Sequence, residues 1–175
     1  MLWGALGALL LYGGNACAAD ANEPELVVTE YAWSSGVDRA SREHAKPAYA
    51  ASAPVQPLYL WIRVRGNRAA LDRLEAEGAL PIRHRWYRTI GSELIDQEAT
   101  FDQKLAIGSG KQSTIGALRR EVEQTGYFNW RTWSNKESIS PGLWEVRIVS
   151  DDGERVLCTS RATPKPCEPR IRVKK

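Results

Sequence analysis

The chain has 175 residues, of which 43% are hydrophobic and 26% are charged. This balance is typical of one soluble globular domain with a sizeable core, and it excludes a disordered or fibrous protein. The net charge at pH 7 is +3, but positive charge is concentrated from Arg161 to the C-terminus. Such a tail can attract polyanions, or it can be a solvated edge strand whose basic side chains prevent edge-to-edge pairing. The second interpretation is favoured here, and no nucleic-acid partner is expected.

The N-terminus has the pattern of a secretory signal. An apolar run, Leu2–Tyr12, is followed by small residues at Ala16 and Ala18, as in an A-x-A cleavage site. We therefore expect residues 1–18 to be a signal peptide and the protein to be periplasmic or otherwise exported. Two alternatives stay open. One is an uncleaved anchor, because no Lys or Arg precedes the run, and the other is a lipoprotein acylated at Cys17, whose preceding residues partly fit a lipobox.

Two further cysteines, Cys158 and Cys167, flank a proline-containing loop between two strand-like runs. A short disulfide across this hairpin is expected, and such bonds persist in oxidising compartments. Cys17 would then be the odd cysteine, and its removal with the signal would leave an even number. The alternative is a pair of unlinked thiols.

The mature chain is predicted to begin with one strand and a long loop, which lead into a β domain. Residues 19–57 contain a first strand, Leu26–Trp33, and then a loop rich in Ala, Ser and Pro. The core domain is expected at 58–175, together with that first strand. Leu58–Arg65 alternates aliphatic with other side chains at the period of a strand. Asn67–Gly78 has leucines at helical spacing between an asparagine N-cap and a glycine stop.

The second half continues with strands and one more helix. Ile82–Thr89 alternates cleanly, Glu93–Ile107 is one bent strand or two short ones, and a helix is expected over Ser113–Thr125. Tyr127–Val149 holds three of the seven Trp residues in two strand-like runs joined by a Pro-Gly turn. The last predicted strands are Arg155–Thr159 and Pro169–Val173. Eight or nine short strands predict a mainly β fold, an antiparallel, immunoglobulin-like β-sandwich with two short inserted helices.

Three motifs stand out in these strands. They are His84-Arg85-Trp86-Tyr87, then Trp130-Arg131-Thr132-Trp133-Ser134-x-Lys136, then Gly142-x-Trp144-x-Val146-x-Ile148 before an Asp-Gly turn. Together, over roughly Leu58 to Leu157, they resemble a bacterial family of exported or envelope proteins that carry a domain of unknown function. The resemblance implies a β-sandwich and an envelope location, and it transfers no catalytic residues.

Catalytic patterns are scarce in this sequence. It contains no HExxH, nucleophile elbow, Cys-x-x-Cys or P-loop. His84 is predicted on an inward face, as a hydrogen-bonded core residue rather than a base. The carboxylates of Glu93, Asp96, Glu98 and Asp102 could act as a pair in glycoside hydrolysis, so an envelope glycan-acting hydrolase is one alternative. The favoured expectation is a protein that is not an enzyme and uses no cofactor or metal.

Binding is the function that the sequence favours. Exposed aromatic and arginine side chains on a rigid sheet can stack on sugar rings or clamp a partner protein. The opposing interpretation is that such side chains stack on one another and lie beneath the two helices. We therefore expect a non-catalytic envelope module that binds a protein or glycan, with a structural lipoprotein anchored at Cys17 as a further alternative. Membrane contact is expected only through an uncleaved signal or that lipid. The residues predicted on outward faces of neighbouring strands are Tyr59, Trp61, Arg85, Tyr87, Arg131 and Trp133.

Overall fold

The computed structural model describes residues 23–48, 50–52, 57–90, 93–94, 99–108, 112–159 and 165–174. The predicted signal, with Cys17, lies outside these residues. The described part of the chain contains eleven strands and two helices. In chain order they are β1 Leu26–Ser34, β2 Ala50–Ser52, β3 Leu58–Gly66, α1 Arg68–Glu77, β4 Leu80–Ile90, β5 Glu93–Leu94, β6 Phe101–Ile107, α2 Gln112–Thr125, β7 Phe128–Lys136, β8 Gly142–Ser150, β9 Leu157–Cys158, β10 Lys165–Pro166 and β11 Arg170–Lys174.

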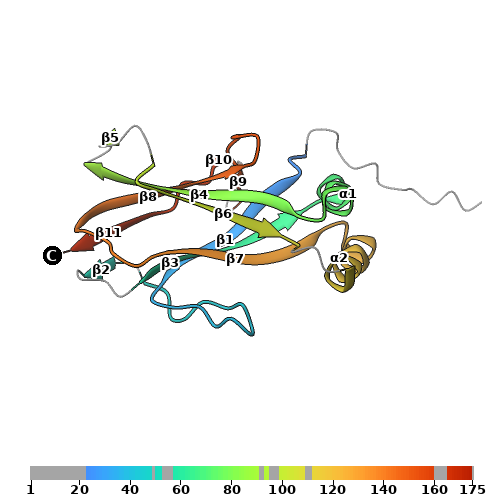
Figure 1. Cartoon of the computed structure of the whole chain (residues 1–175), viewed down its shortest axis with the longest axis horizontal. Helices are drawn as coiled ribbons and strands as arrows, with labels where there is room; N and C mark the ends of the chain where they lie inside the picture. Colours follow the sequence, from blue (N-terminus) through green and yellow to red (C-terminus); the bar gives the residue numbers. More distant parts are fainter. Residues whose placement is uncertain are drawn as a thin grey trace, which may run out of the picture.

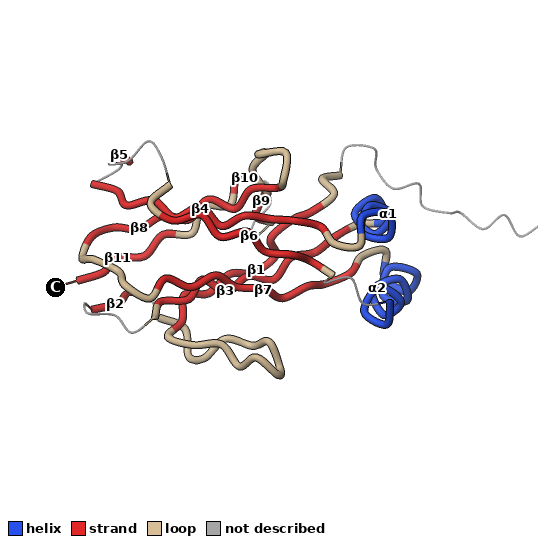
Figure 2. The backbone as a smooth tube through the Cα atoms, viewed as in Figure 1, coloured by secondary structure: helices blue, strands red, loops and turns tan. Residues whose placement is uncertain are grey.

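The strands form two sheets that pack against each other around one core (Figure 1). The first sheet has the strand order β10-β9-β1-β3-β7. The second has the order β2-β11-β8-β4-β5, and β6 also pairs with β4. Figure 2 shows the sheets as two layers with both helices at one end of them. The helices therefore lie over neither outer face.

The fold is mainly β with two helices, as predicted, but it is not the antiparallel, immunoglobulin-like sandwich that the sequence suggests. Each sheet contains a parallel pair, β1 with β9 in the first and β11 with β2 in the second. The long neighbouring strands are antiparallel, for example β3 with β7 and β4 with β8. The prediction was wrong at the two parallel pairs because turn signals report on consecutive strands, whereas these pairs join opposite ends of the chain.

Along each strand, alternate side chains point inward, and the inward ones form the face that each sheet packs against the other. The second sheet contributes Ile82 and Trp86 from β4, and Val146 and Ile148 from β8, all at most 1% exposed. Trp86 meets Trp33 of the first sheet edge to face, with ring centroids 5.4 Å apart, so the two layers interlock through aromatic side chains. On β3 the inward residues are the aliphatic ones, as predicted: Leu58, Leu60, Ile62 and Val64.

Both predicted helices are present. The side chain of Asn67 accepts a hydrogen bond from the Ala70 amide at the start of α1. Gly78 ends this helix with a φ of 79°, and its amide donates to the Leu74 carbonyl. Buried leucines of α1 close the end of the core, and α2 adds a buried stripe to the same cluster: Ile115, Leu118 and Val122.

One stretch follows an expected alternative and another differs from the expected pattern. Glu93–Ile107 contains two short strands, β5 and β6, rather than one bent strand, and both pair with β4. The strand β2 has no counterpart in the sequence prediction, because its three residues, Ala50–Ser52, lie in a polar, Ala-rich stretch without alternation. Its pairing with β11 supplies the structure that the local sequence does not.

The predicted disulfide is present. Cys158 and Cys167 are bonded, with a Cα–Cα distance of 4.7 Å, and both are buried. They close the β9–β10 hairpin, in which Cys158 pairs with Lys165. A disulfide of this kind is consistent with an exported protein. Among the described residues, no helix is long and apolar enough to cross a bilayer.

Replacement of both cysteines by serine should lower the free energy of unfolding by about 2–3 kcal/mol, because the bond closes a short loop and so restricts the unfolded chain. The measurement is urea denaturation of the oxidised wild type and of the double variant Cys158→Ser/Cys167→Ser. Reduction of the wild type is the control, and it should reproduce the loss. Equal denaturation midpoints for the oxidised wild type and the variant would show that the bond does not stabilise this fold.

Candidate functional site

The six side chains predicted to bind a ligand do not form one surface. Tyr59 and Trp61 lie on β3, and Arg131 and Trp133 lie on the adjacent β7, all on the outer face of the first sheet. Arg85 and Tyr87 lie on β4, which belongs to the second sheet. The prediction that these strands are neighbours was wrong, because β3 and β4 are consecutive in sequence but are separated by α1 and enter different sheets.

Trp61 faces outward as its parity predicts, yet it is 0% exposed. The cover is the loop 35–48, not the helices. The Trp61 indole Nε1 donates a hydrogen bond of 2.7 Å to the carbonyl oxygen of Arg42, and the His44 ring lies edge-on at 4.8 Å. Trp133 sits directly opposite on β7. A ligand therefore cannot reach the Trp61 ring while this loop is in place.

The covering loop is internally hydrogen-bonded. The Asp38 amide donates to the Glu43 carbonyl and the Ala45 amide to the Gly36 carbonyl, so the segment folds as a small hairpin. The Asp38 carboxylate accepts the backbone amides of residues 40 and 41, and these bonds lower the pKa of Asp38. A loop with its own hydrogen bonds can hold side chains in fixed positions on the sheet below it.

Arg42 is one of the side chains that this loop places on the first sheet, together with Glu43 and His44. Its guanidinium lies over the Trp130 ring, 4.1 Å from the centroid, and 5.9 Å from that of Trp133. Burial, and then the neighbouring charge of Arg131, lower the pKa of Arg42. Arg131 is neutralised by Glu43 at 3.1 Å, whereas no described carboxylate forms an ion pair with Arg42. Arg42 is thus a partly buried cation without an acidic partner in the described part of the chain.

The backbone of Arg42 is also unusual. Its φ is 60°, and among the described residues it is the one non-glycine residue with a positive φ. A non-glycine residue in this region costs on the order of 1 kcal/mol, and such strain concentrates at functional sites. In this conformation Arg42 accepts the Trp61 indole through its carbonyl oxygen and covers the Trp130 ring with its guanidinium.

A pocket of about 520 Å³ opens beside Arg42, between β7 and α2. Arg42, Trp130 and Arg131 form one side of it, and we refer to it as the Arg42 pocket. The indole Nε1 of Trp130 and the Nε of Arg131 are buried without a hydrogen-bond partner in the described structure. The helix α2 supplies polar groups to the other side: Ser113, Thr114 and Glu121.

The Arg42 pocket combines a cation, an aromatic ring, hydroxyl groups and the Glu121 carboxylate, which accepts a hydrogen bond from Asn129, and this combination suits recognition of a polar ligand. Sequence reasoning found Arg131 but missed Arg42 and the wall formed by α2. No local sequence pattern distinguishes Arg42, because it is a basic residue in a polar loop. Only the length of the loop, which is unusual for a compact domain, could have indicated a functional role.

The two predicted residues on the second sheet are engaged with neighbours. Arg85 lies 3.4 Å from Asp102, which also pairs with Arg83 at 3.2 Å. Tyr87 is 6% exposed, because the Arg147 guanidinium covers its ring at 4.6 Å. Tyr87 therefore offers no free ring for stacking on a ligand.

The residues of the hydrolase alternative are only partly described. Asp102 is neutralised by two arginines, so it is a structural ion-pair partner on an open sheet. Asp96, Glu98 and the side chain of Glu93 lie outside the described residues. Within the described ranges, no group of three His, Cys, Asp or Glu side chains is arranged to hold a metal ion.

His84 is a core residue, as predicted. It is 0% exposed, and its Nδ1 lies 2.8 Å from the Ser134 hydroxyl oxygen. The Trp86 indole donates to the same hydroxyl oxygen at 3.1 Å. Burial lowers the pKa of His84 to about 3, so this imidazole is neutral at physiological pH and has no access to a substrate.

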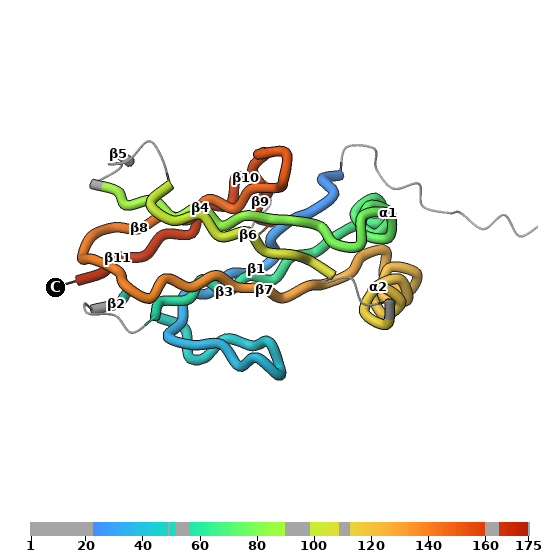
Figure 3. Tube along the Cα trace, viewed as in Figure 1, coloured from blue at the N-terminus to red at the C-terminus, as the bar shows by residue number. Residues whose placement is uncertain are grey.

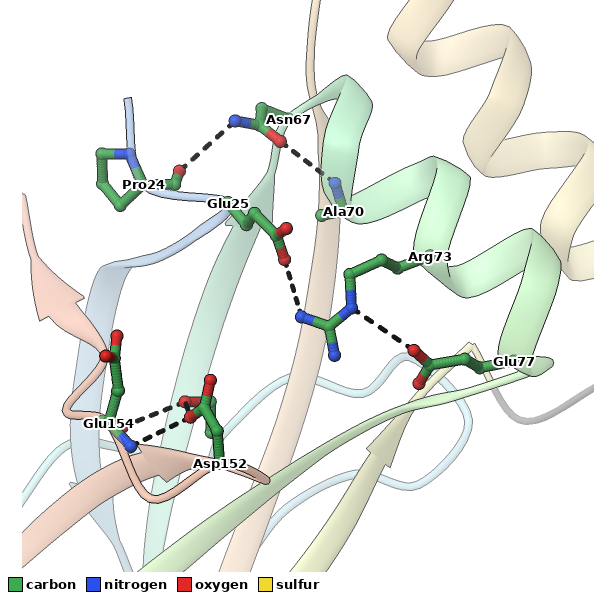
Figure 4. Close-up of polar contacts among 9 residues, drawn as sticks. Pro24, Glu25, Asn67, Ala70, Arg73, Glu77, Asp152 and Glu154 are labelled. Carbon is green, nitrogen blue, oxygen red and sulfur yellow. Dashed lines mark hydrogen bonds and ion pairs between the residues drawn. The ribbon is translucent and has the colours of Figure 1, made fainter. Parts of the chain in front are cut away.

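A second pocket, of about 290 Å³, lies where the start of β1 meets the turn after β8. Figure 4 shows polar contacts in this region of the structure. Arg73 of α1 bonds to Glu25 at 2.7 Å, which raises the pKa of Arg73, and it also reaches Glu77 at 3.4 Å. Asp152 accepts the Ser150 hydroxyl and the Glu154 amide, and these bonds lower the pKa of Asp152. The Arg73 ion pairs fasten α1 to the start of β1, whereas the Asp152 carboxylate is held by neutral donors of its own turn.

No protein-family model matches this sequence, and no curated protein matches it either.

Proposed function

We propose that the protein is a non-catalytic, exported binding domain of the bacterial envelope, whose ligand is a glycan with an anionic group held in the Arg42 pocket. The observation that carries this proposal is the Arg42 guanidinium itself. It is partly buried, stacked on Trp130 and without a described carboxylate partner. A desolvated guanidinium of this kind favours a carboxylate or phosphate as its partner.

The size of the pocket favours a glycan over a protein partner. About 520 Å³ lies in the range of sites for small molecules, and it fits one or two sugar rings. Trp133, half-buried beside Arg131, extends the site with an indole for stacking. Hydroxyl groups on α2 add hydrogen-bond partners for a saccharide.

Export and an envelope location are part of the same proposal. The disulfide supports an oxidising compartment. The N-terminal pattern supports a signal at 1–18, with acylation at Cys17 as the alternative. The three motifs described above support membership of the exported domain family that they resemble.

Replacement of Arg42 by alanine is expected to weaken binding of an acidic oligosaccharide by roughly tenfold to a hundredfold, the range for losing a hydrogen bond to a charged group. Binding would be measured by calorimetry on acidic and neutral oligosaccharides chosen from a glycan array. Arg39→Ala is the matched control, because Arg39 is exposed in the same loop. Arg42→Lys keeps the charge but loses the planar stack on Trp130, so its affinity should lie between those of Arg42→Ala and Arg39→Ala. Equal affinities of the Arg42→Ala and Arg39→Ala variants would remove Arg42 from the site.

A further inference from the structure

The outer face of the second sheet carries a grid of basic side chains that the Arg42 pocket does not involve. We call it the arginine face. Its strands β4, β8 and β11 are adjacent, and their residues are in register, so that Arg85 lies opposite Arg147 and Arg170 lies opposite Glu145. Residues directly opposite in a sheet point to the same side. The face consists of Arg83, Arg85, Arg147, Arg170, Arg172 and Lys174.

Positive charge is in excess on this face because its carboxylates are shared. Asp102 lies within 3.4 Å of both Arg83 and Arg85. Glu145, only 2% exposed, lies 3.0 Å from Arg147 and 2.6 Å from Arg170. Each of these two carboxylates is therefore shared by two guanidinium groups, and Arg170 also lies 3.8 Å from Glu168, which is itself shared with Arg155.

Two basic residues at the end of the face have no such partner. Arg172 and Lys174 are exposed on β11, and no described carboxylate forms an ion pair with either. Their charges add to the excess left by the shared carboxylates.

Protection of a sheet edge does not explain this arrangement. Arg85 and Arg147 lie on β4 and β8, which both have neighbours on either side. Like charges directly opposite each other in a sheet destabilise it. The pair Arg83–Lys104 on β4 and β6 repeats the pattern, although Asp151 lies 3.4 Å from Lys104. A feature that costs stability and is not needed for the fold points to a partner that offsets it.

The chemistry of the face selects among anionic partners. Guanidinium groups bind phosphate oxygens in a bidentate manner. The aromatic ring within the grid, Tyr87, is covered by Arg147, so no ring is free to stack on sugars. Both helices lie at the end of the sheets and leave this face open (Figure 3). The arginine face is open, has no accessible aromatic ring and can bind phosphate groups. It therefore matches a layer of lipid headgroups better than a saccharide chain.

We propose that the arginine face docks on the surface of an anionic phospholipid bilayer by electrostatic attraction. Tyr31, the one large exposed hydrophobic side chain among the described residues, lies on β1 of the first sheet, so no apolar anchor is placed on this face. Attachment is thus peripheral and weakened by salt. The Arg42 pocket, on the first sheet, faces away from the membrane in this arrangement.

Vesicle flotation with the full chain tests this proposal. We expect binding to mixed phosphatidylglycerol–phosphatidylcholine vesicles at low salt, none to pure phosphatidylcholine, and release at high salt. The double variant Arg172→Gln/Lys174→Gln should weaken binding roughly tenfold or more, since each basic side chain near an anionic surface contributes about fivefold. These residues form no described ion pair, so the variant should fold.

The matched control is Arg39→Gln/Lys46→Gln, which removes the same charge from exposed positions of the loop on the first sheet. It should reduce vesicle binding by less than about threefold, and Arg42→Ala should leave it intact. Equal losses in the two double variants would show attraction by net charge alone and overturn the proposal. Binding to phosphatidylcholine alone, or to an acidic polysaccharide but not to vesicles, would overturn it as well.

Discussion

Replacement of His84 by glutamine is expected to remove a loss of unfolding free energy that the wild type shows in acid. This loss reaches about 5 kcal/mol near pH 3, because the pKa of His84 falls from 6.5 to about 3 on folding. In the unfolded chain the imidazole binds a proton below pH 6.5, whereas in the folded protein it stays neutral down to about pH 3. Its contribution to stability is therefore full above pH 6.5 and is lost as the pH falls toward about 3. Glutamine does not titrate, and its amide can still bond to Ser134.

The measurement is the free energy of unfolding of wild type and His84→Gln between pH 7 and pH 4. The difference between the two proteins should change by about 3 kcal/mol over this range, at about 1.4 kcal/mol for each pH unit below 6.5. The carboxylates titrate equally in both, so they cancel. His44→Gln is the control for replacing a histidine outside the core, because His44 is only partly covered. If the unfolding free energy of His84→Gln depended on pH as that of the wild type does, His84 would be protonated in the folded state as in the unfolded chain.

Replacement of Trp61 by alanine is expected to cost about 3–5 kcal/mol of unfolding free energy, the range for removing a large buried aromatic side chain. The ring is fully buried between β3 and the loop 35–48, and its indole bonds to the Arg42 carbonyl. Trp133, directly opposite but only half-buried, is the comparison. Trp133→Ala should cost about 1–2 kcal/mol, because less apolar area returns to water.

Urea denaturation of both variants measures this difference. A third variant, Trp61→Phe, separates the lost ring area from the lost hydrogen bond, which should be worth about 1 kcal/mol. If Trp61→Ala were as mild as Trp133→Ala, the loop would not hold the ring as described. The expected result also means that loss of ligand binding in Trp61→Ala would report on folding, so Arg42 is the better position for a binding test.

The sequence predicted what depends on neighbouring residues. Alternation identified Leu60 and Ile62 as core, the spacing of Cys158 and Cys167 indicated the disulfide, and the cap at Asn67 located α1. Which side chains of a strand are buried follows from the alternation along that strand alone, so it is a local property of the sequence. These parts of the fold needed no knowledge of which strands pair.

Parts of the site depended on distant contacts and could not be predicted in this way. Parity placed Trp61 outward, but no local pattern shows that a loop folds back over it. Parity alone groups Arg85 with Arg131, because both alternate with core residues, although their strands belong to different sheets. Arg42 acquires its importance only from Trp61 and Trp130, which lie far along the chain.

The two parallel pairs also determine when the fold can form. Val27 of β1 pairs with Leu157, and Ala50 of β2 pairs with Arg172. Neither sheet is complete until the last strands of the chain have been synthesised, and these long-range contacts make folding slow. Until then β1 and β2 have unpaired edges that can join other chains. Completion of both sheets thus requires the C-terminal strands β9 and β11, and the N-terminal strands alone cannot form either sheet in full.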